Sequence, residues 1–176
     1  EKIKNLLYLQ NPTIAPYASL EEVKLRITTK AKNVSEANLL IKPIKKELQE
    51  KFSKYIFGED NDNLPTIIIK ELIKRKESIV FAESCTGGLL SSQITSVSGS
   101  SQVFKGSVIA YSNELKNLLL NVSKNLLNTY GAVSEEVAES MAIGVKNKLN
   151  SDWAISVSGI AGPTGGNESK PVGLVY

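Results

Sequence analysis

The stretch SIVFAESCTGGLLSSQITSV, residues 78–97, decides the fold of this chain. It opens with a short run of mostly apolar residues, passes through two glycines, and continues with apolar residues at helical spacing. This pattern is typical of a buried strand that leads through a tight turn into a helix. We therefore predict a strand over residues 78–83 and a helix over residues 88–97.

The same alternation of strand and helix continues on both sides of this stretch. Further helices are predicted at 66–76, 113–120, 123–131 and 134–149, and further strands at 103–112, 153–159 and 174–176. Such alternation is typical of α/β proteins, in which helices cover both faces of the sheet. Residues 65–176 are therefore predicted to form an α/β domain with a largely parallel sheet and flanking helices.

Residues 1–60 have a different pattern, which predicts a small α+β domain. Residues 1–10 have helical spacing, residues 11–19 are rich in turn formers, and residues 21–31 alternate like a strand. A second helix is expected from Ser35 to about Lys51, interrupted at Pro43, with a short strand at 54–58. The polar stretch GEDNDNLP then reads as the linker between the two domains.

The composition is that of a soluble globular protein and argues against several classes. The 176 residues are 41% hydrophobic and 22% charged, with no apolar run long enough to cross a membrane. A single cysteine, Cys85, excludes an internal disulfide and a cysteine zinc cluster, and it favours a reducing cytoplasm. The net charge of +3 comes from dispersed lysines, with Arg26 and Arg75 the only arginines, which argues against a nucleic-acid surface.

Three segments rich in polar groups or glycine follow predicted strands, at 83–88, 111–116 and 159–173. In open α/β sheets, ligands bind beyond the carboxyl ends of the strands. We therefore expect these three segments to meet at one edge of the sheet and to form a site there.

In the first segment, ESCTGG, Ser84 lies at the strand tip, where it could be a nucleophile. Gly87 and Gly88 open the next helix, so their amides can hold a phosphate or an oxyanion. The alternative is that Ser84 or Thr86 only caps that helix and the glycines allow close packing. A P-loop is excluded, because the lysine that follows its last glycine is missing.

The chain contains no histidine, so a serine nucleophile needs a different base. A lysine whose pKa is lowered by burial can serve, and YSNELK offers one. There Tyr111 ends a strand, Asn113 is predicted to cap a helix, and Lys116 lies about one turn in, facing Ser84. The alternatives are that Lys116 is an ordinary solvated lysine, or that Cys85 is the nucleophile.

The third segment, SGIAGPTGGNESKPVG, is too glycine-rich to be a packed element. Glycines that let the backbone approach a ligand would explain it, while a flexible surface loop is the alternative.

Three stretches together, AESCTGGLLSSQITSVSGSSQVFKGSVIAYSNELK, GAVSEEVAESMA and VSGIAGPTGGNESKPVG, closely resemble the C-terminal domain of the CinA family, the nicotinamide-nucleotide amidohydrolase (NMN deamidase, PncC) domain. Residues 1–60 resemble the KH-like linker domain of that family. The resemblance implies hydrolysis of nicotinamide mononucleotide to nicotinic acid mononucleotide and ammonia, without a metal or other cofactor. It also implies a homodimer, and it connects the chain with competence and pyridine-nucleotide salvage.

Residue by residue, the resemblance implies that Ser84 is the nucleophile, Lys116 the base and Tyr111 an active-site residue. The residues expected to bind the substrate or its oxyanion are Thr86, Gly87, Gly88, Asn113, Gly159, Gly162, Gly165 and Gly166. We expect the chain to be a piece of a longer protein, because it lacks an initial Met and stops within an apparent strand. A non-catalytic nucleotide-binding or scaffold module, and a nucleic-acid accessory protein, are the alternative functions.

Overall fold

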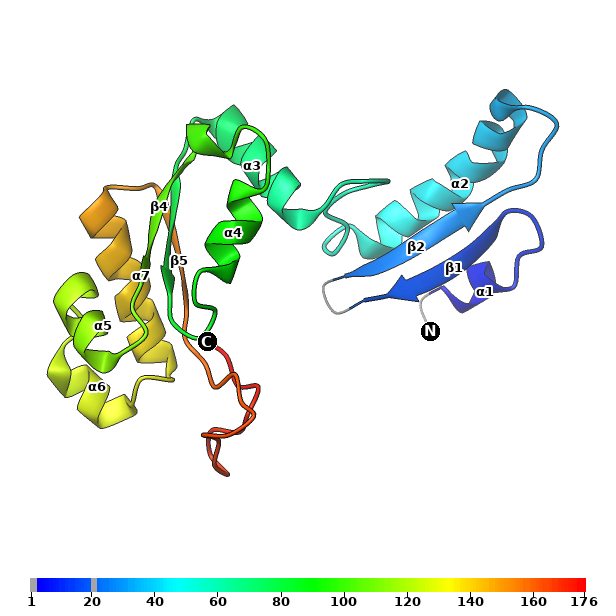
Figure 1. Cartoon of the computed structure of the whole chain (residues 1–176). Coiled ribbons are helices and arrows are strands. Elements are labelled where there is room, and N and C mark those ends of the chain that lie inside the picture. Colours follow the sequence, from blue (N-terminus) through cyan, green and yellow to red (C-terminus); the bar gives the residue numbers. More distant parts are fainter. Residues whose placement is uncertain (1–2, 20–21) are drawn as a thin grey trace. The chain divides into compact units, whose positions relative to one another are not determined.

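The computed structural model describes residues 3–19 and 22–176, which fall into two compact units, Glu1–Asp60 and Asn61–Tyr176 (Figure 1). The predicted fold class, an α/β domain preceded by a small α+β domain, is confirmed. Residues 1, 2 and 21, which belong to the predicted first helix and first strand, lie outside the described residues. Over the described ranges, no helix combines the length and the apolar character needed to cross a membrane.

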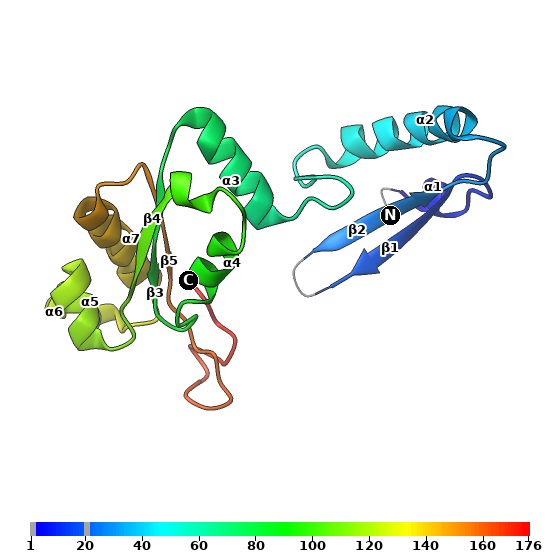
Figure 2. The ribbon, with the colours of Figure 1, turned by 45° about the horizontal axis from the view of Figure 1, so that its top comes forward.

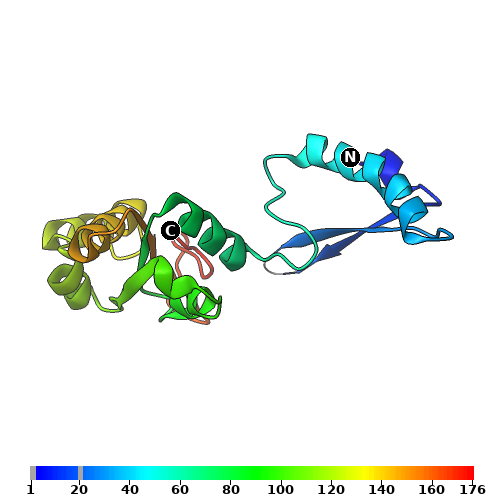
Figure 3. The same cartoon turned by 90° about the horizontal axis from the view of Figure 1, so that it is seen from above.

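The first unit is a β-hairpin with a long helix on one face. Strands β1 (Thr13–Ala18) and β2 (Val23–Thr28) pair antiparallel, and helix α1 (Lys4–Leu7) precedes them. Helix α2 (Val34–Phe52) lies over the hairpin in Figure 3. The core between them is small and centres on Leu6, Ile14 and Leu48.

Three sequence predictions for this unit were wrong. Most of the predicted turn at 11–19 is strand β1, because pairing with β2 overrides its turn-forming residues, and an edge strand tolerates Pro16. Helix α2 is capped by Asn33, whose side chain accepts from the Glu36 N–H at 2.9 Å, and it continues through Pro43. Residues 54–58 form no strand.

The second unit is a three-stranded parallel sheet between two layers of helices. Its strands β3 (Ile79–Glu83), β4 (Phe104–Ile109) and β5 (Trp153–Val157) lie in the order β4-β3-β5. Its helices are α3 (Leu64–Arg75), α4 (Leu89–Thr95), α5 (Asn113–Leu120), α6 (Lys124–Tyr130) and α7 (Glu135–Leu149), with a short 3₁₀ turn, η1 (Ser100–Gln102). Figure 2 shows α3 and α4 on one side of the sheet and α5, α6 and α7 on the other. Residues 174–176 form only an isolated antiparallel bridge, between Val175 and Gly159.

The central strand β3 is buried on both faces, as its continuous apolar run predicts. Ile79 and Phe81 pack in a cluster with residues of α3 and α4, whereas Val80 and Ala82 pack in a cluster with residues of α5, α6 and α7. Each large apolar side chain buried in this way contributes about 1.5–3 kcal/mol. The strand is therefore a rigid base for the residues that follow its carboxyl end.

Helices α5 and α7 touch closely at Gly144, where a Cβ atom would overlap the carbonyl oxygen of Leu120. We expect Gly144→Ala to destabilise the protein by about 1–3 kcal/mol or more, because the backbone at Leu120 would have to move. Urea unfolding would measure this, with Ser140→Ala on the same helix as a control that should change stability by less than about 0.5 kcal/mol. Equal stability of the two variants would contradict the close contact.

The parallel arrangement brings three chain segments to one edge of the sheet. Ser84 follows β3, Ala110 and Tyr111 follow β4, and Ser158 and Gly159 follow β5. The sequence predicts that segments 83–88, 111–116 and 159–173 meet at one edge of the sheet. In the structure these segments lie at the ends of three neighbouring strands.

Candidate active site

Ser84 is the first residue beyond β3, and hydrogen bonds fix its backbone on both sides. Its N–H donates to the Val157 carbonyl at 2.9 Å, and its carbonyl accepts from the Gly87 N–H at 3.2 Å. The residue is only 7% exposed. Its hydroxyl is therefore held at a defined position at the carboxyl edge of the sheet.

Lys116 lies in the first turn of α5, and its side chain runs back to that edge. The N-cap of α5 is Ser112, whose hydroxyl accepts from the Leu115 N–H at 3.1 Å, so the prediction of Asn113 as the cap was wrong by one residue. Lys116 is 1% exposed, and its Nζ lies 2.9 Å from Ser84 Oγ. The structure therefore rules out the alternative of a solvated lysine.

The other contacts of Lys116 Nζ decide what the amine can do. Nζ also donates to the carbonyl oxygens of Ala110 at 2.9 Å and Tyr111 at 3.0 Å. A neutral amine has two hydrogens and one lone pair. When both hydrogens go to these carbonyls, the lone pair is left for Ser84, whose hydroxyl can then donate to it.

Burial lowers the pKa of Lys116 below its ordinary value, while the electrostatic interaction with nearby Cys85 acts in the opposite direction and is the smaller effect. No buried carboxylate contacts Nζ within the described part of the chain, so no ion pair holds the lysine in its charged form. Burial thus makes the base-competent neutral amine accessible at a lower pH than in an exposed lysine.

Tyr111 and Asn113 are exposed, whereas Lys116 is buried. Tyr111 contributes its backbone carbonyl to the Lys116 contact, and the residue is 72% exposed. Asn113 is the first residue of α5 and is also exposed. A role for either side chain in binding the substrate remains a prediction.

Glu83, the last residue of β3, is a functional candidate that the sequence analysis missed. Its carboxylate is fully buried and accepts from the N–H groups of Gly88, Leu90 and Ser91 at 3.0, 3.1 and 2.9 Å, and from the Ser91 hydroxyl at 2.5 Å. Burial alone would raise its pKa, but hydrogen bonds, led by that of the Ser91 hydroxyl, outweigh burial and lower the pKa below its ordinary value. A charged residue that ends an apolar strand is the only trace of this role in the sequence.

Glu83 changes how the ESCTGG turn can act. The N–H of Gly87 donates to Ser84 and that of Gly88 to Glu83, so neither amide is free for a phosphate. The N–H groups of Cys85 and Thr86 have no acceptor among the described residues. The Thr86 hydroxyl is buried near the Glu83 carboxylate and helps to lower the pKa of Glu83. It makes no hydrogen bond of standard geometry among the described residues.

The glycine-rich segment 159–173 folds back on itself after β5. An added Cβ at Gly159 would lie 3.2 Å from Cys85 Sγ, so the start of the segment borders the ESCTGG turn. At Gly162 and Gly166 an added Cβ would meet Val172, so these glycines allow close packing within the segment, while at Gly165 it would make only an ordinary contact with Ile160 at 4.0 Å. Lys170 ties the segment to the turn before α7 by donating to the Tyr130 and Val133 carbonyls at 2.7 and 2.6 Å.

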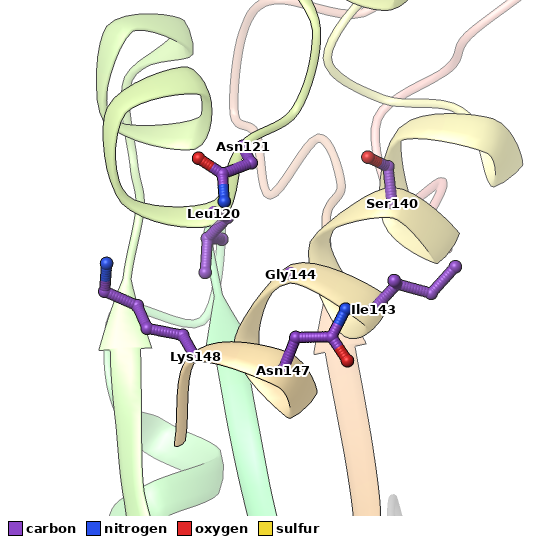
Figure 4. A pocket seen from close by; sticks show the side chains of 7 residues that line it. All are labelled: Leu120, Asn121, Ser140, Ile143, Gly144, Asn147 and Lys148. Carbon is purple, nitrogen blue, oxygen red and sulfur yellow. The ribbon is translucent and has the colours of Figure 1, made fainter. Parts of the chain in front are cut away.

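A pocket of about 350 Å³ lies elsewhere, between the end of α5 and α7 (Figure 4). It is lined by Leu120, Asn121, Ser140, Ile143, Gly144, Asn147 and Lys148. None of the predicted site residues lines it. Across residues 3–19 and 22–176, no three His, Cys, Asp or Glu side chains are grouped as metal ligands.

The fold and the site together define an α/β protein that carries a buried serine–lysine pair at the carboxyl edge of a parallel sheet. The sequence matches the family model described as CinA C-terminal domain over residues 61–176, and that of the damage-inducible protein CinA KH domain over residues 1–58. The chain belongs to the CinA family.

Similar proteins agree with this assignment. The chain is 70% identical to a CinA-like protein of Prochlorococcus marinus (strain MIT 9215), over 100% of this chain and 42% of that protein. The competence/damage inducible protein CihA from Agrobacterium tumefaciens is 40% identical, with a TM-score of 0.64 over 68% of this chain and 73% of that one. A CinA superfamily protein from Escherichia coli is 30% identical, with a TM-score of 0.62 over 70% and 75%. The chain thus spans about two fifths of the length of the curated relatives it matches.

Proposed function

We propose that the second unit, within the full-length protein, hydrolyses the carboxamide of nicotinamide mononucleotide to a carboxylate and ammonia. The observation that carries this proposal is the 2.9 Å contact between Lys116 Nζ and Ser84 Oγ in a buried site. Paired with a neutral lysine, a serine hydroxyl becomes a nucleophile for an acyl carbon without histidine. The nucleotide substrate is proposed from the resemblance to the amidohydrolase domain of the CinA family.

In the proposed reaction, Lys116 accepts the Ser84 proton as Oγ attacks the carboxamide carbon. The tetrahedral intermediate then loses the amide nitrogen, which takes the proton from Lys116 and leaves as ammonia. An ester between Ser84 and the nicotinoyl group remains. Water attacks this ester while Lys116 takes its proton, and that proton returns to Ser84 as the acid leaves.

The free N–H groups of Cys85 and Thr86 are the proposed donors to the oxyanion. They directly follow the nucleophile and have no acceptor in the described part of the chain. Donors that are already oriented stabilise the charge that develops on the carbonyl oxygen. The unsatisfied Thr86 hydroxyl is a candidate contact for the substrate, because a buried hydroxyl without a partner costs about 1–3 kcal/mol.

Location and assembly belong to the same proposal. The single cysteine supports a location in the cytoplasm. The family resemblance supports a homodimer that acts in pyridine-nucleotide salvage.

The rate should rise with pH, because only neutral Lys116 accepts the serine proton. Burial lowers the pKa of Lys116, so the lysine loses its proton at a lower pH than an exposed lysine and the rising limb of kcat/KM should lie below pH 10.5. A pH profile of ammonia release that extends to pH 11 would measure this limb. A rate that rises only above pH 10.5 would contradict a lysine base whose pKa is lowered by burial.

The direct test is ammonia release from nicotinamide mononucleotide by the full-length protein, with free nicotinamide as the comparison substrate. The proposal predicts ammonia from the nucleotide. Tight binding of the nucleotide without any ammonia would instead support a non-catalytic nucleotide-binding module.

A further inference from the structure

We infer that Glu83 is a positioning residue for the proposed amide hydrolysis: its buried carboxylate fixes the start of α4 and so holds the turn after Ser84 in its reactive shape. The inference rests on the proposed function, since it concerns the same nucleophile and the same oxyanion donors. It adds a residue that makes no contact with Ser84 Oγ or Lys116 Nζ among the described hydrogen bonds.

Both carboxylate oxygens take part in the network. One oxygen accepts from the N–H groups of Gly88 and Leu90, and the other from the N–H and the hydroxyl of Ser91, with Ser107 Oγ at 3.5 Å. A backbone carbonyl or a single hydroxyl could not satisfy so many donors. Two oxygens with a full negative charge suit this position.

The geometry links these bonds to the nucleophile. Glu83 belongs to the rigid central strand and directly precedes Ser84, while the groups that it binds lie beyond the turn, from Gly88 onward. The carboxylate therefore clamps the two ends of segment 84–87 together. Segment 84–87 contains Ser84 and the N–H groups of Cys85 and Thr86, so a shift of α4 would move the oxyanion donors relative to Oγ.

Among the described residues, no side chain other than those of Glu83 and its partners caps this end of α4, and the Leu89 N–H donates to the Thr86 carbonyl. Its N-cap is Gly88, which has no side chain, with a φ of 108°. Gly87 also has a positive φ, of 59°, so the turn depends on conformations that other residues adopt at a cost. Hydrogen bonds from outside the turn stabilise this conformation, and the Glu83 carboxylate makes them.

Asp152 offers a matched control for a carboxylate that only stabilises the fold. Its Oδ2 accepts from the N–H and the hydroxyl of Ser78, both at 2.7 Å. Ser78 and Asp152 precede β3 and β5, so they lie at the amino edge of the sheet, opposite Ser84. Asp152 is exposed whereas Glu83 is buried, but both carboxylates accept from a backbone N–H and a serine hydroxyl, so Asp152→Asn perturbs such a network without touching the site.

The experiment compares Glu83→Gln with Asp152→Asn in the full-length protein, at a temperature where circular dichroism shows both to be folded. Gln has the shape of Glu but turns an NH₂ group toward donors that need an acceptor. We expect kcat for ammonia release to fall about 10²-fold in Glu83→Gln, the cost of a misplacement of about 1 Å, with KM changed less than about threefold. In Asp152→Asn, kcat should stay at the wild-type value.

A second measurement separates positioning from stability. Pyridine-3-boronic acid forms a tetrahedral adduct with a serine nucleophile, whereas nicotinic acid mononucleotide binds as a planar product. In Glu83→Gln the boronate should lose affinity by about the same factor as kcat, while the product keeps its affinity. Loss of affinity for both ligands, or for neither, would overturn the inference.

Ser91→Ala is a milder variant if Glu83→Gln does not fold. It removes one hydroxyl from the network and should lower kcat about tenfold, whereas Ser92→Ala, on the exposed side of α4, should leave kcat unchanged. If the wild type releases no ammonia, the proposed function itself fails. An active wild type with an equally active, folded Ser91→Ala or Glu83→Gln contradicts only the role of Glu83.

Discussion

Ser84→Ala is expected to lower kcat for ammonia release from nicotinamide mononucleotide by about 10⁴-fold or more. Removal of the nucleophile leaves only binding and oxyanion stabilisation, which sustain a small residual rate in serine hydrolases. We expect that the nearby thiol of Cys85 does not replace Ser84, because Lys116 Nζ makes its hydrogen bond to Ser84 Oγ. Steady-state ammonia assays on the full-length protein would measure the loss.

The controls for Ser84→Ala are its thermal stability and its binding of the substrate. Ser84 makes its other hydrogen bonds through backbone atoms, which alanine keeps, so the melting temperature should change by no more than a few degrees. Calorimetry should still detect binding of the substrate. A Ser84→Ala protein with more than about one per cent of wild-type activity would exclude Ser84 as the nucleophile.

Lys116→Arg is expected to abolish activity almost as completely, by about 10³-fold or more, although it keeps a long basic side chain in the same place. A guanidinium does not lose its proton in proteins, so it cannot accept one from Ser84. The assay that measures Ser84→Ala also measures this variant, with Lys124→Arg on the exposed start of α6 as the control.

The outcome distinguishes two roles for the lysine. If Lys116→Arg keeps a tenth or more of the wild-type activity, Lys116 acts as a fixed charge and the proposed base is wrong. If Lys116→Ala is inactive but partly recovers when small primary amines are added, the missing function is that of a neutral amine.

The sequence predicted the architecture of the second unit well, because its elements follow from local patterns. The apolar run of β3 could only be a buried central strand, and the residues after each strand had to meet at one edge once the sheet was parallel. The pairing of Ser84 with Lys116 followed from these positions and from the lack of histidine in the chain.

The features that the sequence did not reveal depend on contacts between distant residues. The role of Glu83 needs the start of α4 to return over the end of β3, and no local pattern encodes that return. The Ala110 and Tyr111 carbonyls belong to the backbone, so no residue type marks them. Ser and Asn are both common N-cap residues. Only the structure shows that the backbone is extended at Ser112 and helical from Asn113 onward, so that Ser112 is the cap.

In the first unit the predictions depended more on tertiary context. The proline and small residues of β1 read as a turn, and only its partner strand shows otherwise. Similarly, Pro43 is tolerated inside α2, at a cost of about 3 kcal/mol, because that helix packs Ile44 and Leu48 against the hairpin.

The most direct test of the central claim, that Ser84 forms an ester with the substrate, is mass spectrometry of the full-length protein quenched in acid during turnover of nicotinamide mononucleotide. Trypsin releases Ser84 and Cys85 together in the peptide 77–105, since no other Lys or Arg lies between Lys76 and Lys105. The proposed mechanism predicts a nicotinoyl nucleotide adduct on Ser84 in this peptide, absent in Ser84→Ala. An adduct on Cys85, or an unmodified peptide under conditions that trap acyl-enzymes, would contradict it.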